Sequence, residues 1–302
     1  MYNLSNLTIV IVTFLTSRET LNDCLNSIDK SIKVIVVENS IKFRDRQFFL
    51  NKFKNLRIYC SGKNLGYGGG NNFGLGKVKT DFALILNPDT ILDKYFFKNL
   101  KPLLNNKSFS VIGCELIDNK NYMTGGFFDK GRNQTFKNDF FNTKRTNLTK
   151  VDWVTGSSML LNLKRIKTKK IFDENFFLYF EEFDFCQNLK SKNSLVYLCK
   201  SLKIYHLGFK SSYSRKNNFK KESVKLRNWH WRWSQFYYYK KNYGFMNAFL
   251  GSAGKLFKSI FKTFIYLIIF DHENMNKYLY RSLGLTSSIF GFNSSYRGKF
   301  FN

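Results

Sequence analysis

Acidic residues are scarce in this chain of 302 residues. Its 21 Asp and Glu residues stand against 49 Lys and Arg residues, which gives a formal net charge of +28. We therefore expect an anionic partner: a nucleic acid, a membrane surface or phosphorylated small molecules. A genome-wide codon bias toward Lys, Asn, Phe, Tyr and Ile is the alternative explanation of this composition, so the charge alone does not choose a partner.

Cysteine pairs and long apolar runs are also missing. The five cysteines are scattered and form no C-x-x-C pair, which argues against a zinc ribbon or a disulfide framework and favours a reduced, cytosolic setting. Residues 1–16 have no basic region and no cleavage site, so we expect a β-strand there and no signal peptide. Lys255, Lys258 and Lys262 interrupt the most hydrophobic C-terminal segment, and no transmembrane span is predicted.

Four short apolar runs separated by helical patterns predict a doubly wound α/β sheet. They are Leu7–Phe14, Ile35–Val37, Leu56–Cys60 and Phe82–Leu86. The 43% hydrophobic content is ample for a buried core. In such folds ligands bind beyond the carboxyl ends of the strands, and polar motifs follow the runs at those ends.

The composition changes along the chain. Residues 119–150 are polar and rich in Gly, Asn and Lys, which predicts hairpins or a flexible loop. Residues 185–270 hold 17 Lys and Arg residues and a single acidic residue, Glu222, with Trp and Tyr interleaved. We place a boundary near residue 215, between an α/β domain over 1–215 and a basic, aromatic-rich helical region over 216–302.

Two motifs follow apolar runs. The glycine-rich stretch Gly62–Gly74 is expected to open a helix where backbone N–H groups approach an anion, the alternative being a flexible turn. Asn87-Pro88-Asp89 places a carboxylate where a cation bridging two phosphates would need one, the alternative being an ordinary turn.

An acidic cluster stands out in this basic chain. Five carboxylates fall within twelve positions: Asp173, Glu174, Glu181, Glu182 and Asp184. Neighbouring carboxylates repel, which raises the proton affinity of one of them and suits it to general-base work. Helix capping is the alternative. His206 follows a short apolar run and is a candidate for a metal or a phosphate, or a structural residue.

In their order and spacing over residues 5–215, these motifs resemble glycosyltransferase family 2, and within it the rhamnosyltransferase-like branch that builds bacterial surface polysaccharides. The matching stretches are Thr13-Phe14, Val36–Ser40, Asn64–Gly74, Leu86–Asp89, Asp152–Gly156, Phe172–Tyr179 and His206. The resemblance implies a GT-A fold, with a nucleotide-sugar-binding α/β half followed by an acceptor-binding half.

The resemblance also implies roles for single residues. Asp89 would hold Mg²⁺ or Mn²⁺ on the donor diphosphate, with His206 and Lys210 adding to the clamp, and Glu182 would be the general base of an inverting transfer. Glu38 and Glu182 stand where the family usually has Asp. The remaining expected nucleotide- and substrate-binding residues are Thr13, Phe14, Glu38, Asn64, Gly66, Tyr67, Asn72, Asn87, Trp153, Gly156, Glu181 and Asp184; for Trp153, a place in the core is the alternative to sugar stacking.

By resemblance the donor is dTDP-rhamnose as a first choice, with UDP-hexoses open, and the acceptor is a lipid-linked saccharide at the inner face of the cytoplasmic membrane. Phe245–Phe270 sets Lys255, Lys258 and Lys262 on one helix face whose other positions are mostly apolar. That pattern is typical of a helix lying peripherally on an anionic membrane surface, the alternative being a basic-edged helix packed on the transferase domain.

Two other functions compete with this interpretation. A degenerate, non-catalytic transferase-like subunit is motivated by Glu38 and Glu182. A nucleic-acid-binding protein would use the basic, aromatic tail. The acidic cluster would repel a phosphate backbone, so we expect no nucleic-acid partner.

Overall fold

The computed structural model describes residues 4–105, 108–117, 124–128, 148–206 and 217–298. Its strands are β1 (Leu7–Thr13), β2 (Lys33–Glu38), β3 (Leu56–Cys60), β4 (Phe82–Leu86), β5 (Thr90–Leu92), β6 (Val111–Ile117), β7 (Gly125–Gly126), β8 (Leu148–Lys150), β9 (Trp153–Val154), β10 (Ser158–Asn162) and β11 (Val196–His206). Its α-helices are α1 (Arg18–Asn26), α2 (Arg46–Lys52), α3 (Gly66–Leu75), α4 (Phe96–Leu100), α5 (Leu163–Ile166), α6 (Glu181–Ser191), α7 (Asn217–Tyr243), α8 (Phe245–Ile268) and α9 (His272–Ile289), with 3₁₀ turns at Leu4–Asn6 and Lys101–Asn105. Lys210, the boundary near residue 215 and most of the predicted loop over 119–150 lie outside the described residues.

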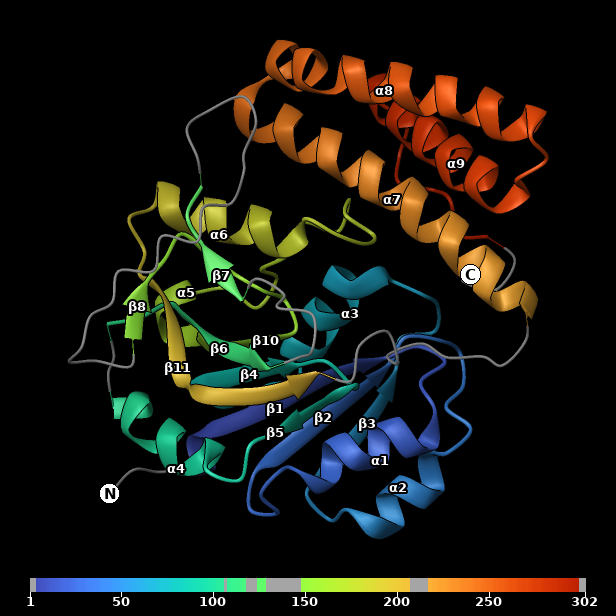
Figure 1. Ribbon diagram of the computed structural model, residues 1–302. Helices are drawn as coiled ribbons and strands as arrows, with labels where there is room; N and C mark the ends of the chain where they lie inside the picture. The colour runs from blue at the N-terminus through green and yellow to red at the C-terminus, as the bar shows by residue number, and fades with distance from the viewer. Residues whose placement is uncertain (1–3, 106–107, 118–123, 129–147, 207–216, 299–302) are drawn as a thin grey trace.

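The described strands form a mixed sheet in the order β3-β2-β1-β4-β10-β6-β11-β5, with β8 paired to β11 (Figure 1). The strands β1 to β4 run parallel, as the four predicted runs required. Antiparallel β10 lies between β4 and β6, and β11 runs parallel to β6. The carboxyl ends of β1, β2, β4 and β11 therefore share one edge of the sheet.

Both faces of the sheet are covered, because alternate residues of a strand point to opposite faces. Leu7, Ile9 and Ile11 of β1 join the core beneath α1, α2 and α4. Val10 joins a second core that includes residues of α3, α6 and α7. All four β1 side chains are fully buried. A sheet buried on both sides explains why its strands read as continuous apolar runs without polar alternation.

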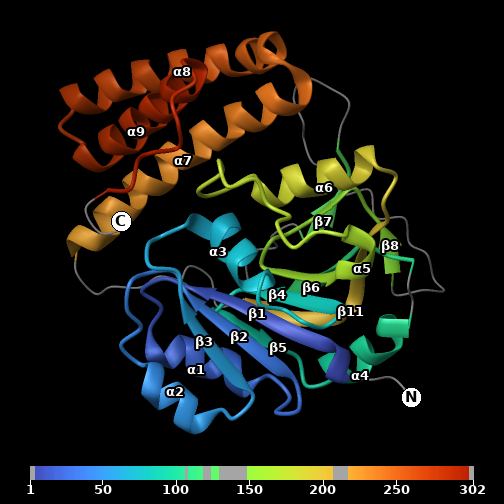
Figure 2. The ribbon, with the colours of Figure 1, turned by 180° about the vertical axis from the view of Figure 1, so that it is seen from behind.

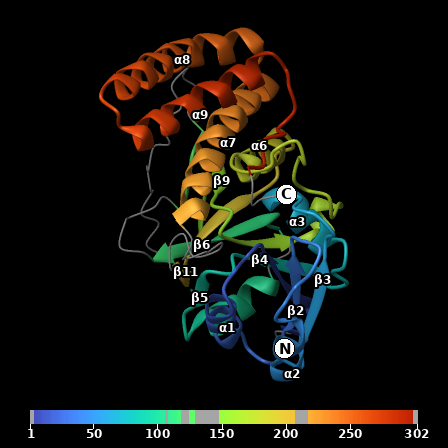
Figure 3. The ribbon, with the colours of Figure 1, turned by 90° about the vertical axis from the view of Figure 1, so that its right-hand side faces the viewer.

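The helices α7, α8 and α9 form a bundle over the α6 side of the sheet, with α8 outermost (Figures 1 and 3). A Cβ on Gly284 of α9 would lie 2.2 Å from the carbonyl oxygen of Trp229 on α7, so glycine is what lets these helices approach so closely. Trp229 and Trp233 stack on each other inside the bundle, and both are buried. Trp229 and Trp233 thus serve internal packing, whereas Trp231 between them is 40% exposed.

The predicted helix over Phe245–Phe270 is confirmed as α8. The stripe toward α7 and α9 repeats every three to four residues and consists of the buried Ala248, Ser252 and Ser259 and the half-buried Lys255 and Lys262. Its small side chains leave room there for the lysine stems. The apolar positions face outward and are exposed: Phe257, Phe261, Phe264, Ile268 and their neighbours.

Within the described part of the chain, no helix combines the length and the hydrophobicity that crossing a bilayer requires. All five cysteines are free thiols, in agreement with the predicted absence of a disulfide framework.

Candidate active site

Asp89 and His206 meet at the carboxyl edge of the sheet. The antiparallel pairing of β5 with β11 sets His206 opposite Thr90, the residue after Asp89. The His206 Nε2 atom consequently lies 3.5 Å from Asp89 Oδ1, and Asp89 is buried. A turn also joins this edge to β10, because the Asn87 N–H donates to the carbonyl oxygen of Ser157 at 2.9 Å.

Glu38 ends β2 beside the end of β1. Its carboxylate accepts hydrogen bonds from the hydroxyls of Thr13 and Ser40, each at 2.7 Å. Burial raises the pKa of Glu38 above its ordinary value, and these two bonds oppose the shift. Phe14, next along the chain, packs against the small cluster of Phe177, Phe219 and Leu226, which joins the end of β1 to α7.

Asn39 organises the glycine-rich segment, which forms helix α3 as predicted. Its side-chain amide donates to the Asn64 side chain at 3.1 Å and to the Gly66 carbonyl at 2.9 Å. Its oxygen accepts from the Leu65 N–H at 3.1 Å. The sequence marked Asn64 and Gly66 as ligand contacts, and the structure shows that Asn39 positions both.

Two expected ligand contacts lie in the packed interior. The Asn72 side chain accepts from the N–H groups of Ile171 and Phe172 and donates to the Phe172 carbonyl. Trp153 is 3% exposed and packs edge-on against Phe183 with ring centres 4.9 Å apart. Asn72 thus anchors α3 to the 171–174 segment, and Trp153 has the core position that was the alternative to sugar stacking.

The acidic pair Glu181-Glu182 opens helix α6. The two preceding residues, Tyr179 and Phe180, both have φ of +70°, a conformation that costs a non-glycine residue about 1–3 kcal/mol. Glu181, Glu182 and Asp184 all lie in the first turn, where the helix dipole favours negative charge. The N-cap residue itself, Phe180, makes no side-chain cap hydrogen bond. The place of the three carboxylates in the first turn agrees with helix capping and dipole complementation, the alternative to the general-base role.

Burial dominates the electrostatics of this pair. It raises the pKa of Glu182 to about 7, against opposing hydrogen bonds from the Glu182 and Gly156 backbone N–H groups. Burial and the charge of Glu182 raise the pKa of Glu181 well above its usual range. Near neutral pH the pair therefore retains a proton, and its titration belongs to both groups together.

One backbone turn at residues 156–157 joins the acidic pair to the strand edge. The Gly156 N–H donates to the Glu182 carboxylate, and the Gly156 carbonyl accepts from the Tyr67 hydroxyl. The adjacent Ser157 carbonyl accepts from the Asn87 N–H, two residues before Asp89. The structure thus brings Glu182, Tyr67, Gly156, Asn87 and Asp89 into one site.

Helix α7 holds the strained turn from the other side. The Trp231 ring contacts those of Tyr179 and Phe180 with centres 5.2 and 5.4 Å apart. The Ser234 hydroxyl donates to the Leu178 carbonyl at 2.7 Å. Sequence reasoning did not identify these positioning residues, although the run of aromatics around Trp231 was the available signal.

Asp184 of α6 has a structural partner, Lys241, on α7. The Lys241 ammonium lies 2.8 Å from carboxylate oxygens of both Asp173 and Asp184. The Asp184 side chain is 1% exposed and that of Lys241 is 32% exposed, so the ion pair joins a buried carboxylate to an ammonium at the surface. Two of the five clustered carboxylates therefore fasten α7 to the α/β domain, which separates them from the Glu181-Glu182 pair.

The donor set at Asp89 fits a divalent cation that is shared with a diphosphate. Among the described residues, no group of three or more His, Cys, Asp or Glu side chains is placed to hold a metal. One carboxylate and one imidazole at 3.5 Å would leave most coordination positions to phosphate oxygens and water, as Mg²⁺ commonly has. Such a site would bind metal together with the nucleotide.

The sheet topology and the acidic pair at its edge define a GT-A type transferase fold. The family model "Glycosyl transferase family 2" matches residues 8–166, more than half of the chain, and the chain belongs to this family. The low-salt glycan biosynthesis hexosyltransferase Agl10 of Haloferax volcanii is 26% identical over 216 residues, which is 67% of this chain and 67% of that protein.

Two solved structures share the fold. GalNAc-T7 with UDP, GalNAc and Mn²⁺ superposes with a TM-score of 0.56 at 11% identity, over 79% of this chain and 50% of that one. This chain thus spans about half the length of that structure. The mannosyltransferase PcManGT from Pyrobaculum calidifontis, in complex with GDP-Man and Mn²⁺, has a TM-score of 0.51 at 11% identity, over 94% of this chain and 87% of that one.

The start of α3 gives a test of how the site is assembled. Gly66 has φ +75°, and a Cβ there would lie 2.2 Å from the Phe177 carbonyl oxygen. We expect Gly66→Ala to lower the free energy of unfolding by about 3 kcal/mol, measured by urea denaturation, because strain and a backbone clash add.

Gly62→Ala is the matched control, since Gly62 has φ +81° with no neighbouring atom within 4 Å. It should cost only about 1 kcal/mol, from backbone strain alone. Equal losses in the two variants would show that the contact with Phe177 is not required.

Proposed function

We propose that this chain is an inverting, metal-dependent glycosyltransferase of the rhamnosyltransferase-like branch. It would move a sugar from a nucleotide-sugar donor, dTDP-rhamnose first and a UDP-hexose otherwise, to a saccharide acceptor. The observation that carries the proposal is Glu182: a carboxyl with its pKa raised to about 7, tied through Gly156 and Ser157 to the strand edge that bears Asp89. The hexosyltransferase relative in glycan biosynthesis supports it.

In this mechanism Glu182 takes the proton from the acceptor hydroxyl. The acceptor oxygen then forms its bond to the anomeric carbon as the bond from that carbon to the diphosphate oxygen breaks. The nucleoside diphosphate leaves with the bonding electron pair, and the sugar passes through an oxocarbenium-like state. A base with a pKa near the working pH is the efficient choice for this proton transfer.

On the donor side, Asp89 and His206 would hold Mg²⁺ or Mn²⁺. A bound divalent ion supplies charge stabilisation for the departing diphosphate oxygens. Asn39, which follows the carboxyl end of β2, holds the N-terminal turn of α3 through the Gly66 carbonyl. Glu38 is the proposed contact for the nucleoside base, with Thr13 and Ser40 fixing its carboxylate.

We propose a lipid-linked acceptor in bacterial surface polysaccharide synthesis and a position at the inner face of the cytoplasmic membrane. The support is the exposed apolar face of α8, which lies on the outer side of the bundle (Figure 2). Exposed apolar surface of this extent is typical of an interaction site. We also propose the division into a transferase domain over 1–215 and a membrane-facing helical region over 216–302.

The base assignment predicts the effect of Glu182→Gln. This change keeps shape and hydrogen-bonding atoms but removes the proton acceptor, so turnover should fall at least about a hundredfold while donor affinity is nearly unchanged. Steady-state transfer assays and calorimetry on the same preparation measure the two quantities. Asp184→Asn should be milder, and a Glu182→Gln variant that kept more than about a tenth of the turnover would refute the assignment.

The raised pKa predicts a pH profile. Because the base must be deprotonated, kcat/KM should rise with pH, bend near pH 7 and level off above it. With an ordinary pKa of 4.5, the profile would instead be flat between about pH 6 and 8. A flat rate profile over this interval, with chemistry rate-limiting, would contradict the assignment.

The metal site predicts that donor binding by the native chain is tighter with Mn²⁺ than with EDTA. Asp89→Asn should abolish this difference, because the main oxygen ligand is lost while the fold survives. Calorimetric titration with the nucleotide sugar measures it. Asp93→Asn is the control, since Asp93 accepts instead from the Tyr95 N–H and the Tyr205 hydroxyl. Equal affinity of the native chain under both conditions would remove the metal from the mechanism.

A further inference from the structure

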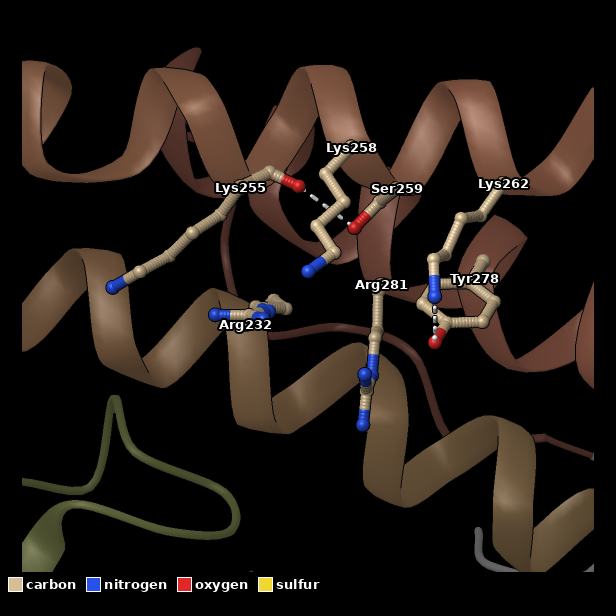
Figure 4. Close-up of a pocket in the computed structure, with 7 residues that line it drawn as sticks. All are labelled: Arg232, Lys255, Lys258, Ser259, Lys262, Tyr278 and Arg281. Atoms are coloured by element: carbon tan, nitrogen blue, oxygen red, sulfur yellow. Dashed lines mark hydrogen bonds between the residues drawn. The ribbon is translucent and has the colours of Figure 1, made fainter.

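A basic pocket lies between the three C-terminal helices, on the far side of α7 from the acidic pair. It is lined by Arg232 of α7, Lys255, Lys258, Ser259 and Lys262 of α8, and Tyr278 and Arg281 of α9, and its volume is about 220 Å³. Lys255 and Lys258 extend from α8 toward Arg232, with Arg281 beside them (Figure 4). At about 30 Å³ per water molecule, this space holds a phosphate group and several waters.

The five cations of this pocket are not neutralised by carboxylates. Throughout the described ranges, no Asp or Glu oxygen lies within 4 Å of any of them. Three of them have neutral hydrogen-bond partners: Gln235 for Arg232, Asn228 for Arg281 and the Tyr278 hydroxyl for Lys262. The Arg232 Nε atom is buried without a hydrogen-bond partner. Gathering like charges in this way is unfavourable until an anion enters.

The pKa values of two pocket residues also indicate that the cations repel one another. Burial, together with the charge of Arg281, lowers the pKa of Arg232. Burial and the charge of Arg232 lower the pKa of Lys255. Both shifts express the cost of like charges held close together in a partly dry space, a cost that a bound oxyanion would reverse.

The exposed surface beside the pocket is hydrocarbon. The outward positions of α8 include Phe257 and Ile268, which are 73% and 74% exposed, and Phe264. Phe257 and Phe261 stack on each other at the surface. A helix with cations on its inner side and bare aromatic rings outside matches a ligand that carries a phosphate and long apolar chains.

We propose that this pocket binds the phosphate group of an anionic lipid whose hydrocarbon chains lie along the exposed face of α8. The proposal rests on the proposed membrane association and gives it a defined headgroup site. Arg232 and Arg281 supply planar donors for phosphate oxygens, and Lys255 and Lys258 supply point charges. A nucleic acid would set its charged backbone against phenylalanine, and a second copy of this chain would bring a further net charge of +28, so neither fits the surface.

The test is vesicle binding by the full chain in the absence of nucleotide sugar. Phosphatidylcholine vesicles with and without phosphatidic acid are sedimented with the protein. We expect binding to the phosphatidic acid vesicles, and Arg232→Gln combined with Lys258→Gln should weaken it about tenfold. The control is Lys220→Gln combined with Lys240→Gln, which removes the same charge from exposed positions of α7 outside the pocket; it should weaken binding less than about threefold.

Two further measurements decide whether the pocket binds the phosphate of a lipid or a free oxyanion. Phe257→Ser with Phe264→Ser should weaken vesicle binding but leave any effect of inorganic diphosphate on the melting temperature unchanged. If inorganic diphosphate raises the melting temperature of the native chain but not that of the Arg232→Gln, Lys258→Gln variant, and the native chain binds no vesicle, the pocket is an oxyanion site and the lipid is refuted. Equal losses in the pocket and control variants would refute the pocket itself, leaving only diffuse attraction by charge.

Melting curves of each variant identify any that fail to fold, and Lys258→Gln alone, at an exposed position, then replaces the double variant with an expected loss of about threefold. The outcome is separable from the proposed function. A chain that bound phosphatidic acid vesicles through this pocket but transferred no sugar would refute the glycosyltransferase and leave the pocket standing.

Discussion

The contact between α7 and the segment that precedes α6 is the constraint on which the site depends. Two consecutive non-glycine residues, Tyr179 and Phe180, adopt the left-handed conformation at the start of α6. Such a turn persists only where its surroundings over-determine it. Trp231 packs on both rings, and Lys241 pairs with buried Asp184 one turn into α6. The helical region thus holds the turn that presents Glu182.

The same helix joins the two charged sites of the molecule. Trp231 faces the turn before α6, whereas the next residue, Arg232, lines the basic pocket. Successive residues of a helix lie about 100° apart around its axis. Neighbouring residues of one uninterrupted helix can therefore face the turn before α6 and the basic pocket. Carboxylates are concentrated on the side toward the sheet and cations on the side toward α8. Burial of Glu181 and Glu182 on the sheet side lets a very basic chain keep a protonatable carboxyl pair near neutral pH.

The local patterns predicted the strands well, because short apolar runs in an α/β chain usually form buried strands. Leu56–Cys60 and Phe82–Leu86 form β3 and β4 without a change of bounds. Asn72 and Trp153 were placed in the site because their motif positions carry no information on which way a side chain points. For α8 the lysine spacing left two alternatives open, a membrane surface or packing on the transferase domain, because it does not say which face packs; the buried Ala248, Ser252 and Ser259 identify the packed face.

In the proposed mechanism Glu182 stands one methylene farther from the backbone than the aspartate that the family resemblance implies for the base, and its burial explains how the longer side chain can serve. Burial is the largest cause of the raised pKa of Glu182, and hydrogen bonds from backbone N–H groups only moderate it. Burial depends on the enclosing segments, including the Gly156 turn, and less on the length of one side chain. The longer side chain of Glu38 is likewise accommodated, because its carboxylate accepts hydrogen bonds from the hydroxyls of Thr13 and Ser40. The two substitutions therefore preserve the charge at each place, and the surrounding backbone sets how readily that charge forms.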